Sequence, residues 1–138
     1  MPVMGTKPLR GVPDSRSRRG TVNIILDGGS GAVLATGLWR PIHFPFAAII
    51  TEIRLEANVS GSIVIDLYQC RDDERPAVAS QSICAADKPT LSSSQRTTNT
   101  QLQGWNNTIN KDDWLYPNVD SVTTISWVTL SITYRRML

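Results

Sequence analysis

The sequence predicts an all-β protein: an antiparallel β-sandwich, jelly-roll-like, with an extended N-terminal arm. Apolar and polar residues alternate with a period of two in several segments. Turn-forming residues recur about every ten residues, and no segment has the apolar spacing of a helix longer than a turn or two. Hydrophobic residues make up 41% of the 138-residue chain, which is enough for one domain with its own core. We expect residues 1–20 to form the arm and residues 21–138 the sandwich.

The arm is predicted from its composition. Residues 1–20 contain three prolines and three glycines, and they show neither helical nor strand periodicity. Five basic residues stand there against the single acid Asp14, a net charge of +4, so that the rest of the chain sums to −2. We therefore expect the arm to lie extended along a neighbouring subunit and to contact acidic groups there. Its predicted partner-binding residues are Lys7, Arg10, Arg16, Arg18 and Arg19.

The first half of the domain predicts several strands in succession. Residues 21–26 (TVNIIL) form a β-branched run that ends at DGGSG, which we expect to be a tight hairpin turn. Residues 32–44 predict one or two short strands, broken around Gly37 and Pro41. Two alternating strands, residues 48–57 and 62–69, are expected to flank a turn at residues 58–61.

Alternation also predicts which way the side chains of these two strands face. In the first, Ile49, Thr51, Ile53 and Leu55 are expected to face the core, opposite Glu52, Arg54 and Glu56. In the second, Ile63, Ile65 and Leu67 are expected inside, with Asp66 and Tyr68 outside.

The second half of the domain predicts polar loops and one long last strand. Residues 71–76 and 89–98 are expected to be loops, whereas Val128, Leu130 and Ile132 alternate with threonine and serine. In total seven to nine strands are expected. The predicted shared core consists of Ile53, Leu55, Ile63, Ile65, Leu67, Val128, Leu130 and Ile132.

Residues that could carry chemistry are few. Cys70 and Cys84 are expected to be free, partly buried thiols, with a disulfide as the alternative. Together with His43, the one histidine, they do not make a zinc site, and no cofactor is expected. The acidic runs at residues 72–74 and 112–113 are interpreted as solvated surface rather than a calcium site or a glycosidase pair. We accordingly expect no catalytic residue and no metal ligand.

Four tryptophans stand out in a chain of this length: Trp39, Trp105, Trp114 and Trp127. Trp105 follows a glycine and precedes two asparagines, which makes it the candidate for stacking on a carbohydrate. Packing in the core or in an interface is the other interpretation.

The charge and hydropathy patterns indicate where such a protein acts. Its mildly acidic domain does not indicate nucleic-acid binding. The chain has no signal-peptide pattern and no apolar run near the roughly 20 residues that span a bilayer. We expect a protein made in the cytoplasm, with no membrane partner.

Five segments resemble a β-sandwich domain of tailed-bacteriophage virion and tail-associated proteins. They read LDGGSGAVLATGLWRPIHFPF, SGSIVIDLYQ, KPTLSSSQ, LQGWNNTI and NVDSVTTISWVTLSI, and they occur in the family's order between residues 26 and 132. The resemblance implies a virion component without catalytic residues, commonly repeated around a symmetry axis.

The leading hypothesis is therefore a non-enzymatic structural protein of a phage virion, favoured at the tail, baseplate or fibre over capsid decoration. Its expected partners are other virion proteins and copies of itself, as a homotrimer. A carbohydrate-binding module that contacts host surface glycans is the alternative from another class. A polysaccharide hydrolase, which rests on the acidic runs alone, is the least favoured.

Overall fold

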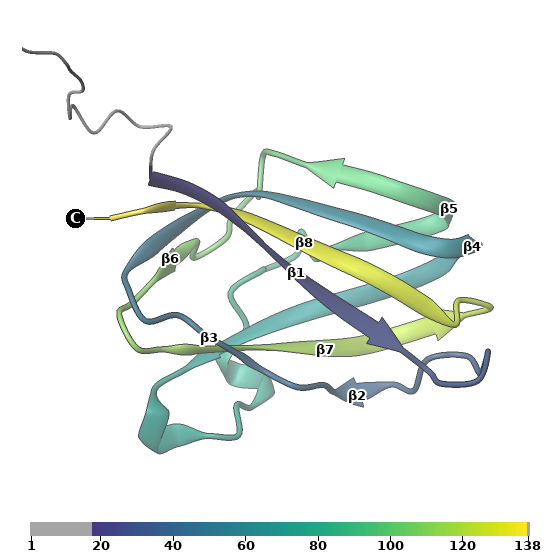
Figure 1. The fold of residues 1–138 in the computed structure, drawn as a ribbon, viewed down its shortest axis with the longest axis horizontal. Coiled ribbons are helices and arrows are strands. Elements are labelled where there is room, and N and C mark those ends of the chain that lie inside the picture. Colours follow the sequence, from purple (N-terminus) through teal and green to yellow (C-terminus); the bar gives the residue numbers. More distant parts are fainter. Residues whose placement is uncertain (1–17, 138) are drawn as a thin grey trace, which may run out of the picture.

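The computed structural model describes residues 18–137, which form a curled antiparallel sheet wrapped into a two-layered β-sandwich (Figure 1). The predicted all-β fold is confirmed. The strands are β1 (Arg19–Asp27), β2 (Gly37–Leu38), β3 (Ile42–His43), β4 (Ala48–Cys70), β5 (Thr90–Asn99), β6 (Thr108–Ile109), β7 (Trp114–Thr123) and β8 (Trp127–Arg136). Two single turns of 3₁₀ helix, η3 (Asp72–Glu74) and η4 (Ala79–Gln81), follow β4.

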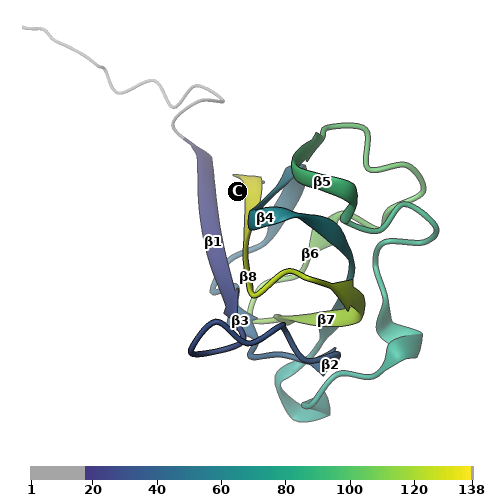
Figure 2. The same ribbon diagram turned by 90° about the vertical axis from the view of Figure 1, so that its right-hand side faces the viewer.

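Strand β4 belongs to both layers. Its first half, from Ala48 to Ala57, pairs with β8, and its second half, from Ser62 to Cys70, pairs with β7. One layer is therefore β1–β8–β4 and the other is β4–β7 with β2 and β3 at its edge. Strand β5 pairs with both halves of β4 and bends with it (Figure 2).

The turn predicted at residues 58–61 is wrong, because the chain bends there without reversing. The register against β5 shifts between Glu56 and Gly61, and a shift of this kind bends a strand. A Cβ atom on Gly61 would lie 2.5 Å from the Thr124 hydroxyl and 2.8 Å from the Thr123 carbonyl oxygen. Glycine thus lets the corner of β4 approach the connection through which the chain crosses from β7 to β8.

Strand β1 begins at Arg19, two residues before the predicted start, and forms one edge of its layer. It pairs with β8 along its whole length, and Gly20 lies opposite Tyr134, whose ring occupies the space above the glycine. The DGGSG segment after β1 is a turn, with positive φ at Gly29 and Gly31. It is not the predicted hairpin, because β2 pairs with β7 in the other layer.

The predicted core is confirmed, since each of its eight residues is at most 1% exposed. The prediction for the start of β4 is wrong. Ile50 is fully buried, Ile49 is half-buried and Thr51 is exposed. Thr51 is an extra residue in the pairing with β8, and a one-residue shift inverts the faces on its N-terminal side.

The predicted polar loop at residues 89–98 is instead largely strand β5. Leu91 is the one residue of this strand that is buried, so alternating hydrophobicity could not reveal it. The threonines of β5 favour extended backbone. The strand forms because β5 pairs with β4, whose backbone supplies the hydrogen bonds.

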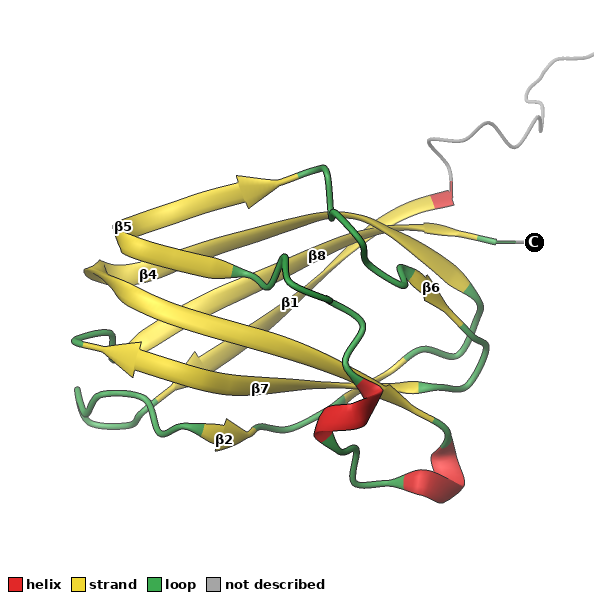
Figure 3. Ribbon diagram, turned by 180° about the vertical axis from the view of Figure 1, so that it is seen from behind, coloured by secondary structure: helices red, strands yellow, loops and turns green. Residues whose placement is uncertain are grey.

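The outer face of the second layer is covered, which corrects the predicted exposure of Asp66 and Tyr68. After β4 the chain folds back through η3 and η4, outside the layer of β4 and β7 (Figures 2 and 3). Ala77 there packs with Tyr68, Cys70 and Tyr116 in a second, smaller core. Asp66 and Tyr68 are in consequence only 5% and 7% exposed.

Cys70 and Cys84 are free thiols, as predicted, and both are buried. Burial raises the pKa of each thiol above its ordinary value, and this is the main cause at both residues. A buried thiol with a raised pKa is a poor nucleophile. We expect neither cysteine to react with Ellman's reagent in the native protein and both to react in denaturant. Rapid labelling of the native protein would contradict the burial described here.

Candidate functional site

Two of the five predicted arm residues lie in the described chain. Lys7, Arg10 and Arg16 fall outside it, whereas Arg18 immediately precedes β1 and Arg19 opens that strand. Arg19 therefore belongs to the sandwich, where it stands opposite Arg135 on β8.

The β1–β8 pairing brings four arginines to one end of the molecule: Arg18, Arg19, Arg135 and Arg136. Within residues 18–137 none of them is paired with a carboxylate, and the Arg136 guanidinium lies 4.7 Å above the centre of the Phe46 ring. Sequence reasoning missed Arg135 and Arg136. The signal was the Arg-Arg pair near the C-terminus, but its closeness to the arm depends on a pairing between residues more than a hundred positions apart.

Two hollows of about 250 and 210 Å³ lie between β1 and the segment that contains β2 and β3. Trp39 and Arg40 face residues 24–27 in the first, and Phe44, Phe46 and Tyr134 line the second. Strand β1 is paired on one side only within the described chain, and such an edge can accept another extended segment.

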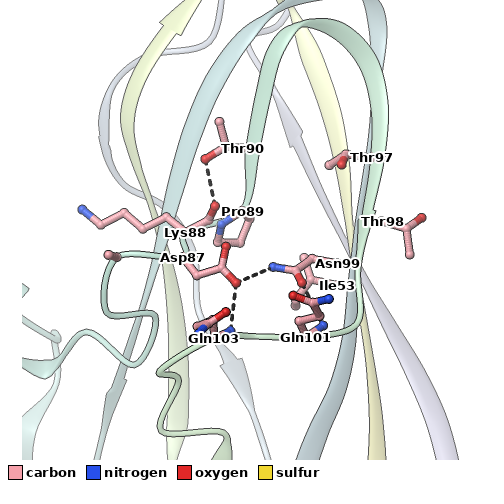
Figure 4. A pocket seen from close by; sticks show the side chains of 11 residues that line it. Ile53, Asp87, Lys88, Pro89, Thr90, Thr97, Thr98, Asn99, Gln101 and Gln103 are labelled. Atoms are coloured by element: carbon pink, nitrogen blue, oxygen red, sulfur yellow. Dashed lines mark hydrogen bonds between the residues drawn. The ribbon is translucent and has the colours of Figure 1, made fainter.

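A polar pocket of about 500 Å³ lies beside β5 (Figure 4). One Asp87 carboxylate oxygen accepts hydrogen bonds from the Asn99 side-chain amide and the Gln103 backbone N–H, each at 2.9 Å. These bonds, the one from Asn99 above all, lower the pKa of Asp87. The Asp87 carboxylate thus holds the chain that follows β5 in place, and its hydrogen bonds serve the fold.

The Trp105 side chain is held in place by the fold and is half-buried. Its indole Nε1 donates a hydrogen bond of 2.7 Å to the Asp87 carbonyl oxygen, and its partly buried ring packs against the main core. Trp39 and Trp114 also donate from Nε1, to the Ala35 carbonyl and the Asp72 carboxylate. Trp127 is the most exposed of the four tryptophans, with 38% of the residue exposed.

Asp66 is the most deeply buried charged residue of residues 18–137, with 5% of the residue exposed. One Asp66 oxygen accepts hydrogen bonds from the Leu67 backbone N–H at 2.8 Å and from the Ser82 hydroxyl at 2.5 Å. The other lies 3.3 Å from Lys88 Nζ, which also binds Asp120 at 2.8 Å. The hydrogen bond to Asp120 is the main cause that raises the pKa of Lys88. This ion pair tethers the returning chain to β4.

The other candidate groups are spread over the surface. His43 lies on the short strand β3, and its Nε2 is 3.5 Å from the Asp112 carboxylate. The acidic run at residues 72–74 is exposed, but Asp113 is only 6% exposed, and burial raises its pKa; solvated surface is thus wrong for this residue. In the described part of the chain, no three His, Cys, Asp or Glu side chains are arranged to hold a metal ion. Residues 18–137 include no helix of the length and apolarity needed to cross a membrane.

Comparisons with known proteins leave the family open. No family model and no curated protein matches the chain. One similar solved structure is the cyanophage Pam1 capsid asymmetric unit, with 16% identity and a TM-score of 0.24 over 85% of this chain and 81% of that chain. Another is infectious bursal disease virus, Gx strain, with 14% identity and a TM-score of 0.28 over 99% of this chain and 42% of that chain. TM-scores this low say nothing about function, so the resemblance to the tailed-phage domain stays a prediction.

Proposed function

We propose that this chain is a non-enzymatic structural component of a bacteriophage virion, associated with its tail, baseplate or fibres. The observation that carries the proposal is the ordered set of segments between residues 26 and 132 that resembles the tailed-phage domain. In the fold, these segments supply the second half of β4, much of β5 and the crossing from β7 to β8. These segments thus belong to the framework of the sandwich, which supports the proposal that the fold is the one the resemblance implies.

Residues 1–17 are proposed to attach the domain to a neighbouring subunit. They join the sandwich at Arg18, which is one of the four arginines and immediately precedes the edge strand β1. Seventeen extended residues reach at most roughly 60 Å, which is enough to cross the face of a neighbour of this size. Copies of the chain arranged around a threefold axis would cover the β1 edges that a lone sandwich leaves open.

Deletion of residues 1–17 tests the attachment. This truncation keeps β1 complete, and we expect a domain with an unchanged midpoint of thermal unfolding that no longer enters particles. The measurements are thermal unfolding by circular dichroism and immunoblotting of purified particles. As a matched variant, replacing Lys7, Arg10 and Arg16 by serine keeps the length and removes the charge. Normal incorporation of the truncated chain would refute attachment through residues 1–17.

Two further measurements address stoichiometry and location. Sedimentation of the full chain at high concentration is expected to show a trimer, and a monomer alone would count against cyclic assembly. A density map of the intact particle is expected to place the chain on the tail, baseplate or fibre. Density on the capsid shell would contradict a tail, baseplate or fibre location and would identify the chain as a capsid decoration protein.

A further inference from the structure

The exposed ring of Trp127 differs from the other three indoles in its hydrogen bonding. Trp39, Trp105 and Trp114 each donate from Nε1 to an oxygen of the protein. Among residues 18–137, Trp127 Nε1 has no such acceptor. Its backbone is held in place by Asn58, whose side-chain oxygen accepts hydrogen bonds from the N–H groups of Ser126 and Trp127 at 3.0 and 3.3 Å. The ring is thus carried on a fixed backbone, with its face and its donor available.

Trp127 borders a hollow of about 410 Å³ on the outer face of the first layer, where β8, β4 and β5 lie side by side (Figure 1). Thr129, Glu56 and Arg96 form one row across these strands, and Ser131, Arg54 and Thr98 form the next. All six side chains line the hollow. Its size is in the range of small-molecule sites.

The polar groups of the hollow are complementary to hydroxyl groups. Arg54 is held by an ion pair with Glu52, whereas neither Glu56 nor Arg96 has an ion-pair partner in the described chain. A carboxylate can only accept hydrogen bonds, and guanidinium and indole N–H groups can only donate them. A sugar hydroxyl does both, so neighbouring hydroxyls of one ring can satisfy Glu56 and Arg96 together. The charges of Glu52, Arg54, Glu56 and Arg96 cancel, which favours a neutral ligand.

We propose that this hollow binds a neutral pyranose of a surface glycan, stacked on Trp127, with Glu56 accepting from its hydroxyls and Arg96 donating to them. The apolar C–H face of a pyranose matches an exposed indole, which combines an apolar body with a polar N–H. A second copy of the chain fits less well, because a protein interface would bury a surface on which hydroxyl and charged groups surround a single ring. The binding does not depend on the assembly proposed above.

The test is a titration of the full chain, labelled with ¹⁵N, with the methyl glycosides of glucose, galactose, mannose and N-acetylglucosamine. A glycan array of bacterial surface polysaccharides is probed with the same protein. We expect shifts that centre on the Trp127 indole N–H and on β4 and β5 around Glu56 and Arg96. Trp127→Ala is expected to weaken binding about ten-fold or more. Leu38→Ala is the matched control, an exposed apolar side chain of the other layer (42% exposed), and should bind as the native chain does.

Glu56→Gln and Arg96→Ala, on the exposed face, keep the proposal testable if Trp127→Ala fails to fold, and each should weaken binding. Absence of binding to every glycoside and glycan overturns the proposal, as does binding that all three variants retain. Loss of self-association in Trp127→Ala without sugar binding would identify the face as a protein interface and would equally overturn it. None of these outcomes bears on the deletion of residues 1–17, which tests attachment separately.

Discussion

Replacing Leu130 by alanine is expected to lower the free energy of unfolding by about 2–5 kcal/mol. Leu130 is fully buried, and on β8 it lies between Ile24 of β1 and Leu55 of β4. Removing its side chain loses the free energy of burying apolar surface. It also leaves a cavity, because the three paired strands cannot move together to fill the space. Since small domains are stable by about 5–15 kcal/mol, the loss is a large share of the total.

Urea unfolding followed by circular dichroism measures this effect. Thr129→Ala is the matched control, because Thr129 is the next residue of the same strand and points to the outer face. It should change the free energy of unfolding by no more than about 1 kcal/mol. Equal losses from the two substitutions would mean that the inward and outward faces of β8 are assigned wrongly.

Lys88→Met is expected to destabilise the protein by about 3 kcal/mol at neutral pH, near the lower end for breaking a buried ion pair. The side chain of Asp66 is only 7% exposed, whereas that of Lys88 is 33% exposed, which moderates the loss. Methionine keeps most of the apolar stem of lysine and removes the charge. The Asp66 carboxylate would then retain its bonds from Leu67 and Ser82 but lose its cation.

A double-variant comparison separates the charge from the packing. Adding Asp66→Asn to Lys88→Met removes the uncompensated charge, so the double variant should be more stable than Lys88→Met alone. Asp120→Asn removes the more exposed carboxylate bound to Lys88 and should cost less than Lys88→Met. A double variant as unstable as the sum of the two single variants would show that Asp66 and Lys88 do not interact energetically.

The sequence by itself determined the class of fold and most of the core. Alternation is a local property, because neighbouring residues of a strand point to opposite faces whatever the strand pairs with. Ile63, Ile65 and Leu67 could therefore be assigned to the interior without knowing their partners, and so could Val128, Leu130 and Ile132. Free thiols were the favoured prediction for Cys70 and Cys84, but the sequence left a disulfide open, and only the structure shows both cysteines free.

Only the tertiary structure decided what depends on partners distant in the sequence. A glycine with polar neighbours is read locally as a turn, but Gly61 serves the close approach of the crossing from β7 to β8. Strand β5 is almost devoid of buried side chains, and its pairing with β4 makes it a strand. Asp66 and Tyr68 lie at positions of β4 that face away from the main core. The chain that follows β4, through η3 and η4, covers this face and buries both residues.

Which tryptophan forms the candidate sugar site also depends on partners that are distant in the sequence. Local composition favoured Trp105, with its glycine and asparagine neighbours, and gave no reason to prefer Trp127. Whether an indole is free to bind depends on the acceptor that its N–H meets and on what covers its ring. For Trp105 that acceptor is the carbonyl of Asp87, eighteen residues earlier in the chain. For Trp127 the neighbours are side chains of β4 and β5, which the pairing of β8 with β4 and of β4 with β5 brings beside it.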